Sequence, residues 1–240
     1  MTDFDQMTNY ADYIKDDPFR RGLHYPAVEA ALGDVNHKRI LDIGCGDGLF
    51  PRLLAQRGAS VVGYDRAADR IAEASAGETA PGDATFVVAT PDSFAHDGAF
   101  DAATSVMVLQ LATSPEELAA FFRSASRHLE PGGRFISIVL NPQFSAFGQD
   151  FIIRRWTKLE GNRVKTDFLD QSSGRVAMTV LRLHQHTGEE YEQAAVRGGM
   201  KPAAWQKLFA TPDAIRRLGA SFWQPCHEHQ PFALFIAQKQ

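Results

Sequence analysis

Residues 40–48 constrain what this chain can fold into more than any other segment. They read Ile-Leu-Asp-Ile-Gly-Cys-Gly-Asp-Gly, and a helical pattern, Leu-Phe-Pro-Arg-Leu-Leu, follows over residues 49–54. This order predicts a buried strand, a tight glycine turn and the start of a helix. Glycines let a ligand approach the backbone closely, and the free amide groups of a helix N-terminus face such a ligand. The segment therefore predicts a ligand site in an α/β fold.

The residues around the glycine turn narrow the choice of ligand. Asp42 lies beneath the turn, where a carboxylate disfavours a pyrophosphate and favours an ammonium or sulfonium cation. A dinucleotide fingerprint needs a third small residue where the helix packs on the strand, and this chain has Leu49 there. A nicotinamide or flavin ligand is therefore disfavoured, although it stays an alternative.

A second acid, Asp65, ends the next predicted strand over residues 59–65. It follows the glycine turn by about 20 residues, the spacing at which a carboxylate meets ribose hydroxyls in nucleotide-binding βαβ units. The alternative role is that of N-cap for a helix over residues 67–74. The two roles are compatible, and we expect the ribose contact.

Further segments extend the pattern in a fixed order. Residues 86–92 and 98–105 have the form of a third and a fourth strand, and residues 128–136 that of the turn before a fifth. Together with residues 40–48 and Asp65, they resemble the motifs of class I S-adenosylmethionine (SAM)-dependent methyltransferases. The resemblance covers residues 36–141. It is strongest to the small-molecule branch, which acts in secondary metabolism and on quinone-like acceptors.

The resemblance implies a fold and a cofactor. The expected fold is α/β, a Rossmann-like doubly wound sheet of seven strands, mostly parallel with an antiparallel C-terminal hairpin and helices on both faces. The expected cofactor is SAM, with S-adenosylhomocysteine (SAH) as product. The residues expected to bind it are Tyr10, Asp42, Gly44, Gly46, Asp65, Arg66, Thr90, Pro91, Ser105 and Val106. Many relatives carry an acid at the position of Thr90, so Thr90, Asp92 or backbone groups must meet the adenine here.

The order of elements divides the chain into four parts. Residues 1–35 are predicted to form an N-terminal helical lid, and residues 36–141 the SAM-binding core. Residues 142–175 are aromatic and irregular, which indicates an insertion on the substrate side. Residues 176–240 are expected to complete the sheet, beginning with a strand over residues 176–185. In that part a capping box at Thr187 and a proline after Thr211 predict two helix starts.

The chemistry that the resemblance implies needs few catalytic groups. A sulfonium methyl group is already activated, and positioning alone can supply about 7–11 kcal/mol. A base is needed only where the acceptor must lose a proton. The candidates for a base are Tyr13, His24 and His184, and those for acceptor contacts are Tyr25, Gln110, Asn141 and Phe144. Each of these side chains also has a purely structural interpretation, as part of the core or of a packed lid.

Composition limits the partners. The chain of 240 residues has a net charge of −4 and a pI near 6.1, which gives no support for nucleic-acid binding. No apolar run is long enough to cross a bilayer. Two cysteines, Cys45 and Cys226, make a disulfide framework implausible and favour a cytoplasmic location. The histidine pairs at 184/186 and 227/229 are poor metal sites, so no metal is expected.

These observations give one hypothesis and two alternatives. The hypothesis is an enzyme that transfers a methyl group from SAM to a small aromatic or heteroaromatic metabolite by in-line SN2 displacement. Its only expected partner is the small-molecule acceptor, and it would act as a monomer or homodimer. The first alternative is a non-catalytic SAM- or SAH-binding module, and the second is an NAD(P)-dependent oxidoreductase. Whether carbon, nitrogen or oxygen accepts the methyl group stays open.

Overall fold

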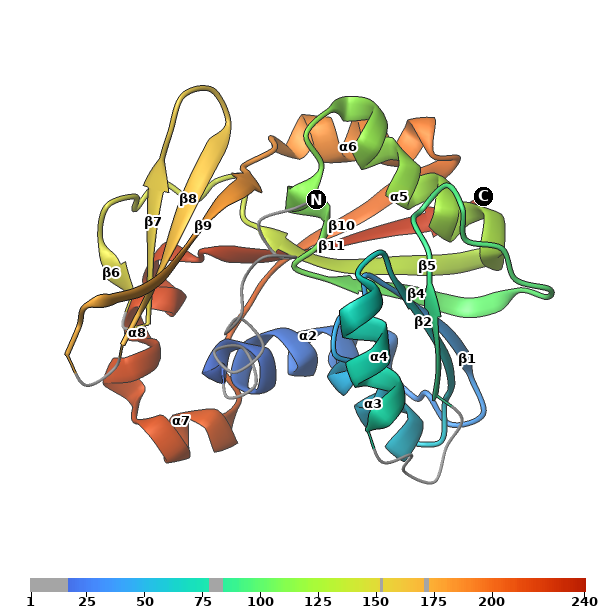
Figure 1. Cartoon of the computed structure of the whole chain (residues 1–240), viewed down its shortest axis with the longest axis horizontal. Helices are drawn as coiled ribbons and strands as arrows, with labels where there is room; N and C mark the ends of the chain where they lie inside the picture. The colour runs from blue at the N-terminus through green and yellow to red at the C-terminus, as the bar shows by residue number, and fades with distance from the viewer. Residues whose placement is uncertain (1–16, 78–83, 152, 171–172) are drawn as a thin grey trace.

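The main sheet of the computed structural model has seven strands in the order β10-β11-β5-β4-β1-β2-β3 (Figure 1). The model describes residues 17–77, 84–151, 153–170 and 173–240. The neighbouring strands among β1 to β5 are parallel, and β11 is antiparallel to both β5 and β10. The strands are β1 Arg39–Ile43, β2 Ser60–Asp65, β3 Ala84–Val88, β4 Phe100–Val106, β5 Leu129–Leu140, β10 Met200–Lys207 and β11 Phe232–Lys239. The predicted fold class, including its antiparallel C-terminal hairpin, is confirmed.

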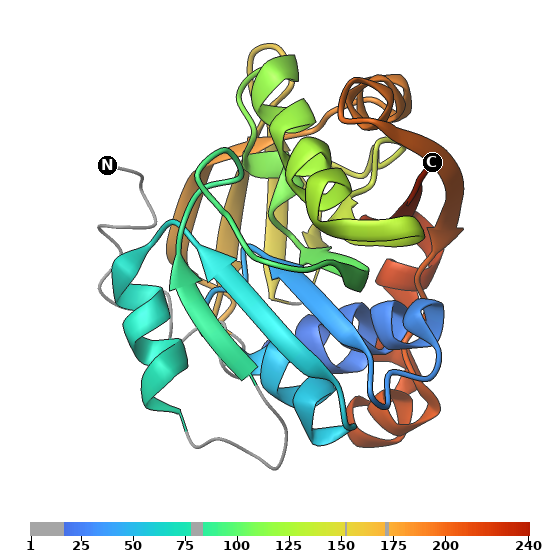
Figure 2. The same cartoon turned by 90° about the vertical axis from the view of Figure 1, so that its right-hand side faces the viewer.

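Helices cover both faces of this sheet (Figure 2). One face packs against α5 (Pro115–His128) and α6 (Gly188–Arg197), and the other against α2 (Tyr25–Leu32) and α3 (Leu49–Gln56). The remaining helical segments are the π-helical turn η2 (Arg20–His24), α4 (Ala68–Ala76), the 3-10 turn η3 (Leu109–Leu111), α7 (Pro212–Leu218) and α8 (Ala220–His229). None of the helices in the described part of the chain is long and apolar enough to cross a membrane.

The sheet has a separate hydrophobic core on each face, because successive side chains of a strand point in opposite directions. In β1, Ile40 belongs to the core under α2 and α3. Leu41 and Ile43 belong to the core under α5 and α6. Strands buried on both faces read as continuous apolar runs, which is why residues 40–43 could be recognised from the sequence.

Local capping explains where three helices begin, and the starts at Thr187 and Thr211 are those that the sequence predicts. The Ser114 hydroxyl accepts a hydrogen bond from the Glu117 amide at 3.2 Å, in front of α5. Thr187 and Glu190 form a complete capping box before α6. Thr211 caps α7, which has proline in its first turn. Each cap satisfies backbone donors that the helix itself leaves free.

A second, antiparallel sheet stands beside the main one, at the left of Figure 1. Its strands are β6 (Asp150–Phe151), β7 (Arg154–Lys158), β8 (Arg163–Leu169) and β9 (Val176–His184). We expected residues 142–175 to be irregular, and the structure instead shows strands, in one of which Trp156 lies between the polar residues Arg155 and Thr157. The predicted strand over residues 176–185 exists, but it pairs with β8. The expected boundary at residue 175 therefore falls inside this second sheet.

Candidate active site

A cavity opens at the carboxyl ends of β1, β2 and β4, where parallel sheets bind their ligands. Three other parts of the chain close it: residues 17–25, the second sheet and Phe232 of β11. Its volume is about 1390 Å³ when its open mouth is counted. The cavity therefore extends from the glycine turn to side chains of the second sheet.

The glycine turn forms one wall of the cavity. Gly44 and Gly46 have φ angles of +74° and +54°, a region that favours glycine. A Cβ atom on Gly44 would lie 2.5 Å from a methyl carbon of Val108, so this position has no space for a side chain. A Cβ atom on Gly46 would meet no atom within 4 Å. The space beside Gly46 is thus open to a ligand that approaches the backbone.

Asp42 lies under this turn and is almost completely buried. Its Oδ1 accepts a hydrogen bond of 2.7 Å from the Thr104 hydroxyl. Burial raises the pKa of Asp42 to about 7, against the opposing effect of the Thr104 bond. A cation bound nearby would favour the ionised carboxylate, and ionised Asp42 would in turn favour a cation.

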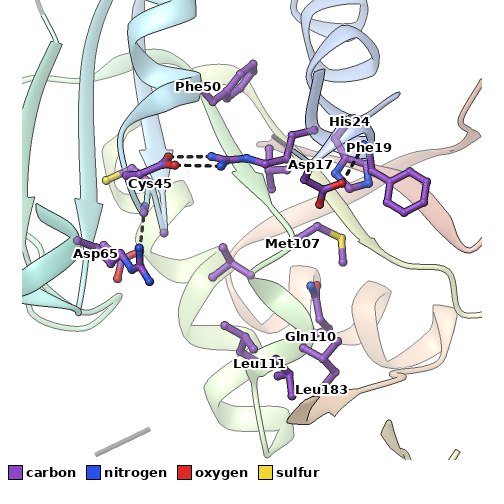
Figure 3. A pocket seen from close by; sticks show the side chains of 18 of the residues that line it. Asp17, Phe19, His24, Cys45, Phe50, Asp65, Met107, Gln110, Leu111 and Leu183 are labelled. Carbon is purple, nitrogen blue, oxygen red and sulfur yellow. Dashed lines mark hydrogen bonds and ion pairs between the residues drawn. The ribbon is translucent and has the colours of Figure 1, made fainter. Parts of the chain in front are cut away.

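Asp65 connects two loops at the same wall. One carboxylate oxygen accepts from the Gly46 amide and the other from the Ala67 amide, each at 3.0 Å (Figure 3). The N-cap of α4 is Ala67, so the alternative role of Asp65 as N-cap is wrong. Burial raises the pKa of Asp65, although both amide bonds act in the opposite direction. Asp65 lines the cavity beside Arg66.

A buried ion pair joins the N-terminal segment to the glycine turn. Arg20 donates two hydrogen bonds to Asp47, of 2.9 and 2.7 Å, and a third of 2.6 Å to the Tyr25 hydroxyl. Burial would raise the pKa of Asp47, but Arg20 outweighs this effect and holds the pKa below its usual range. The Tyr25 ring stacks on Phe50 of α3 at 4.6 Å. The sequence analysis did not identify Arg20 or Asp47 as site residues. In the sequence, the pair Arg20-Arg21 indicates only a solvated face or a local anion contact.

Aromatic side chains line the opposite end of the cavity. The Phe232 ring lies 4.4 Å from that of His24 and 5.5 Å from those of Phe19 and Trp156. His24 is buried, and its pKa falls to about 3 because burial and the nearby charges of Arg154 and Arg20 disfavour the imidazolium. A neutral imidazole of this kind is a weak base.

The second sheet supplies the rest of this end. Thr166 faces Trp156 on one neighbouring strand and Val180 on the other, and all three line the cavity. Arg154 lies over the Phe168 ring at 3.7 Å and donates a 2.6 Å hydrogen bond to Asp17. None of these residues was identified as a functional residue from the sequence, because a strand in a poorly patterned segment shows no sign of which face meets a cavity.

Most of the predicted site residues lie at the cavity. Those that line it are His24, Tyr25, Asp42, Gly44, Gly46, Asp65, Arg66, Val106 and Gln110. Tyr10 and Tyr13 lie outside the described residues. Thr90, Pro91, Ser105, Asn141, Phe144 and His184 are not among the lining residues.

Each of these six residues has an identifiable place elsewhere or a local role. The Ser105 hydroxyl donates to the Ile43 carbonyl, the Asn141 amide donates to the Gln230 carbonyl, and Phe144 packs against Trp156. Thr90 forms a local turn with Ser93, and Pro91 lies between them in the same turn. Ala67, Asp69 and Arg70, which follow β2, line the cavity although Thr90 does not.

His184 misses the cavity because β8 and β9 are out of regular register. Val164 pairs with Leu183 and Thr166 with Val180, so β9 holds an extra residue between these pairs. Val180 and Leu183 both line the cavity as a result, and His184 does not. Such a bulge changes which side chains share a face, and the sequence alternation does not reveal it.

Comparison with known proteins identifies the class to which this arrangement belongs. Residues 40–133 match the family model described as "Methyltransferase domain". The resemblance inferred from the motifs is therefore confirmed over residues 40–133.

The curated relatives match about half of this chain. The ubiquinone biosynthesis O-methyltransferase of Pseudomonas aeruginosa strain PAO1 is 34% identical over 125 residues, which are 49% of this chain and 53% of the relative. That of Alkalilimnicola ehrlichii is 31% identical over 141 residues, 55% of this chain and 56% of the relative. The chain thus spans about half the length of the curated relatives it matches.

Solved structures share the fold over a larger part of the chain. A SAM-dependent methyltransferase from Mesorhizobium loti superposes with a TM-score of 0.63 at 24% identity, covering 89% of this chain and 96% of that one. An amino pentose methyltransferase from Micromonospora echinaspora, solved with SAM bound, gives a TM-score of 0.59 at 23% identity, with coverages of 90% and 88%. At this level of identity the likeness supports the fold.

Proposed function

We propose that this chain is a methyltransferase that moves the methyl group of SAM to a small aromatic or heteroaromatic acceptor by in-line SN2 displacement. One observation carries the proposal. The glycine turn of a methyltransferase domain, with Asp42 and Asp65, forms one end of a cavity whose other end is lined by the aromatic side chains of Phe19, Trp156 and Phe232.

The residues at the glycine turn fit such a cofactor. SAM, when bound, supplies a methyl group activated by its sulfonium centre. Asp65 presents a carboxylate at the position where ribose hydroxyls are held in this fold, and Gly46 leaves the backbone open to close approach. Ionised Asp42 would stabilise the positive charge of the cofactor. Arg66 and Val106 complete the wall on either side.

The remaining residues act by positioning and by excluding water. The aromatic walls formed by Phe19, Trp156 and Phe232 would hold a flat acceptor in one orientation. Displacing water from the reacting atoms and aligning them supplies most of the acceleration that such a reaction needs. With its pKa near 3, His24 is suited to donate or accept a hydrogen bond while staying neutral.

The N-terminal segment stays a predicted lid. Asp17 and Phe19 line the cavity, and Arg20 fixes the segment to the glycine turn, which supports this role for the described part of residues 1–35. Tyr10 and Tyr13, proposed for the cofactor and for catalysis, belong to the same lid in this proposal. The ubiquinone O-methyltransferases among the relatives support an acceptor with an aromatic ring. The free, buried cysteines support a cytoplasmic location, and the net charge of −4 supports an enzyme that does not act on nucleic acid. The proposal includes a monomer or a homodimer as the acting form.

Calorimetric titration tests the proposal. SAH is expected to bind with roughly micromolar affinity, about −8 kcal/mol, and NAD is expected to bind negligibly. Tight NAD binding without SAH binding would favour the oxidoreductase alternative. Incubation with SAM and a panel of small aromatic acceptors, followed by detection of SAH and methylated product, separates an enzyme from a non-catalytic binding module.

A further inference from the structure

Three buried polar side chains at the cavity lack hydrogen-bond partners in the described part of the chain. The atoms without a partner are His24 Nδ1 and Nε2, Gln110 Oε1 and Thr166 Oγ1. All three residues are at most 3% exposed and line the cavity. Buried polar groups in folded proteins almost always have partners, so three such groups around one cavity point to a ligand that supplies them.

The three residues come from separate parts of the fold. His24 ends η2, Gln110 lies in η3 after β4, and Thr166 lies in the middle of β8. Figure 3 shows His24 and Gln110 on either side of Met107, with the Gln110 amide directed toward Met107. Strand pairing places Thr166 between Trp156 and Val180 on the face that meets the cavity.

The surroundings of these groups are flat and apolar. Phe232 contacts His24, Phe19 and Trp156 through ring edges and faces. Leu183, Val180 and Met107 line the cavity as well. Walls of this kind select the body of a planar ring, while a few polar groups fix its orientation.

The charges that face the cavity at this end are paired. Asp17 and Arg154 form an ion pair of 2.6 Å, and Arg20 and Asp47 form one of 2.7 Å. His24 is neutral, since burial lowers its pKa to about 3. An ionised acceptor at this end would have to leave water beside described side chains whose charges already pair with each other.

We propose that the acceptor is an uncharged planar ring with at least one hydrogen-bond donor, and that His24, Gln110 and Thr166 select it. The inference rests on the proposed methyltransferase function. A donor is required because Gln110 Oε1 can only accept. An analogue without that donor leaves buried groups unpaired, which is the strongest basis for discrimination between similar ligands.

Calorimetry on the protein saturated with SAH tests this inference with four probes. They are 2-naphthol, 2-methoxynaphthalene, 2-naphthoate and 2-naphthylmethylammonium. We expect 2-naphthol to bind at least about tenfold more tightly than each of the others, the scale of one hydrogen bond. Equal or tighter binding of the methoxy, anionic or cationic probe would overturn the inference, and so would an absence of 2-naphthol binding.

Variants assign the selection to the named residues. Thr166→Val keeps the shape of the side chain and removes its hydroxyl, and Gln110→Met and His24→Phe remove the other polar groups. Each is expected to reduce the preference for 2-naphthol over 2-methoxynaphthalene by about fivefold to tenfold. Thr179→Val is the matched control, because the Thr179 hydroxyl bonds Asp167 and Thr179 does not line the cavity. Equal losses for both probes, or an unchanged preference, would contradict selection by these residues.

The SAH titration keeps the two proposals apart. If SAH binds and the probes show no preference, the inference on the acceptor fails and the proposed cofactor stands. If SAH does not bind, the proposed function fails. The same probe titrations on the protein without SAH then still show whether the three polar groups select an uncharged donor.

Discussion

At the scale of single residues, Asp65 accepts a hydrogen bond from the glycine turn and also lines the cavity. If its carboxylate accepts ribose hydroxyls, Asp65→Ala should weaken SAH binding by about 10- to 150-fold, or about 1.5–3 kcal/mol, the range for hydrogen bonds to a charged group. Calorimetry measures this loss. Asp97→Ala, at an exposed aspartate in front of β4, is the control and should leave the affinity unchanged.

The main competing role for Asp65 is to hold the turn by its bonds to the Gly46 and Ala67 amides. A large fall in the melting temperature of Asp65→Ala with unchanged SAH affinity would favour that purely structural role.

Asp42 predicts a pH dependence of cofactor binding. Its pKa of about 7 in the ligand-free protein means that the carboxylate gains a proton as the pH falls through 7. Since a cationic ligand prefers the ionised form, the affinity for SAM, which carries the sulfonium charge, should rise by about tenfold between pH 6 and pH 8. Calorimetry at a series of pH values measures the profile. Asp42→Asn should bind more weakly and flatten it, and a profile identical to that of the unchanged protein would refute the assignment.

The same raised pKa has the opposite effect on the ligand-free fold. The folded protein binds this proton more tightly than the unfolded chain, whose aspartate has a pKa near 3.8. The contribution of Asp42 to the free energy of unfolding is therefore complete below about pH 4 and is lost as the pH rises toward 7.

At the scale of elements, the Arg20–Asp47 pair joins the N-terminal helical segment to the turn before α3. Both side chains are mostly buried, with 14% and 11% exposed. Removal of one partner leaves a buried charge unpaired, so Arg20→Ala and Asp47→Ala should each destabilise the fold. The double variant should then be less destabilised than the sum of the two single effects. Urea unfolding of the single and double variants should give a coupling energy of about 1–3 kcal/mol.

The pair Arg57–Glu29 is a matched control for this cycle. It also joins two helical regions, at 3.0 Å, but its side chains are 46% and 26% exposed. Its coupling should be about 0–1 kcal/mol, as for surface ion pairs. Equal coupling energies in the two cycles would show that the Arg20–Asp47 pair acts only as a surface contact.

At the scale of the whole molecule, the cavity is assembled from the glycine turn, the N-terminal segment, the second sheet and β11. In the described residues, no group of three or more His, Cys, Asp or Glu side chains could hold a metal ion. We therefore expect methyl transfer, measured as SAH released with the first productive acceptor, to withstand EDTA. Loss of turnover on chelation, with recovery on adding magnesium or zinc, would contradict this expectation.

The sequence alone predicted the fold of the main sheet and several residues of the glycine-turn end of the cavity, but Thr90, Pro91 and Ser105 do not line it. Residues 40–48 carry their information locally, because a buried parallel strand, a turn that needs positive φ angles and a helix start each have a composition of their own. Asp65 could be placed from its spacing in the same βαβ unit, and the caps at Ser114, Thr187 and Thr211 are local as well.

Only the tertiary structure decided the aromatic end of the cavity. Arg20 and Asp47 are 27 residues apart, and Arg154 and Asp17 are 137 apart, so neither pair could be read from local patterns. The bulge between β8 and β9 decides that Leu183 faces the cavity and that His184 does not. Contacts between distant segments depend on how the two sheets pack together, and that packing has no signature in any short stretch of sequence.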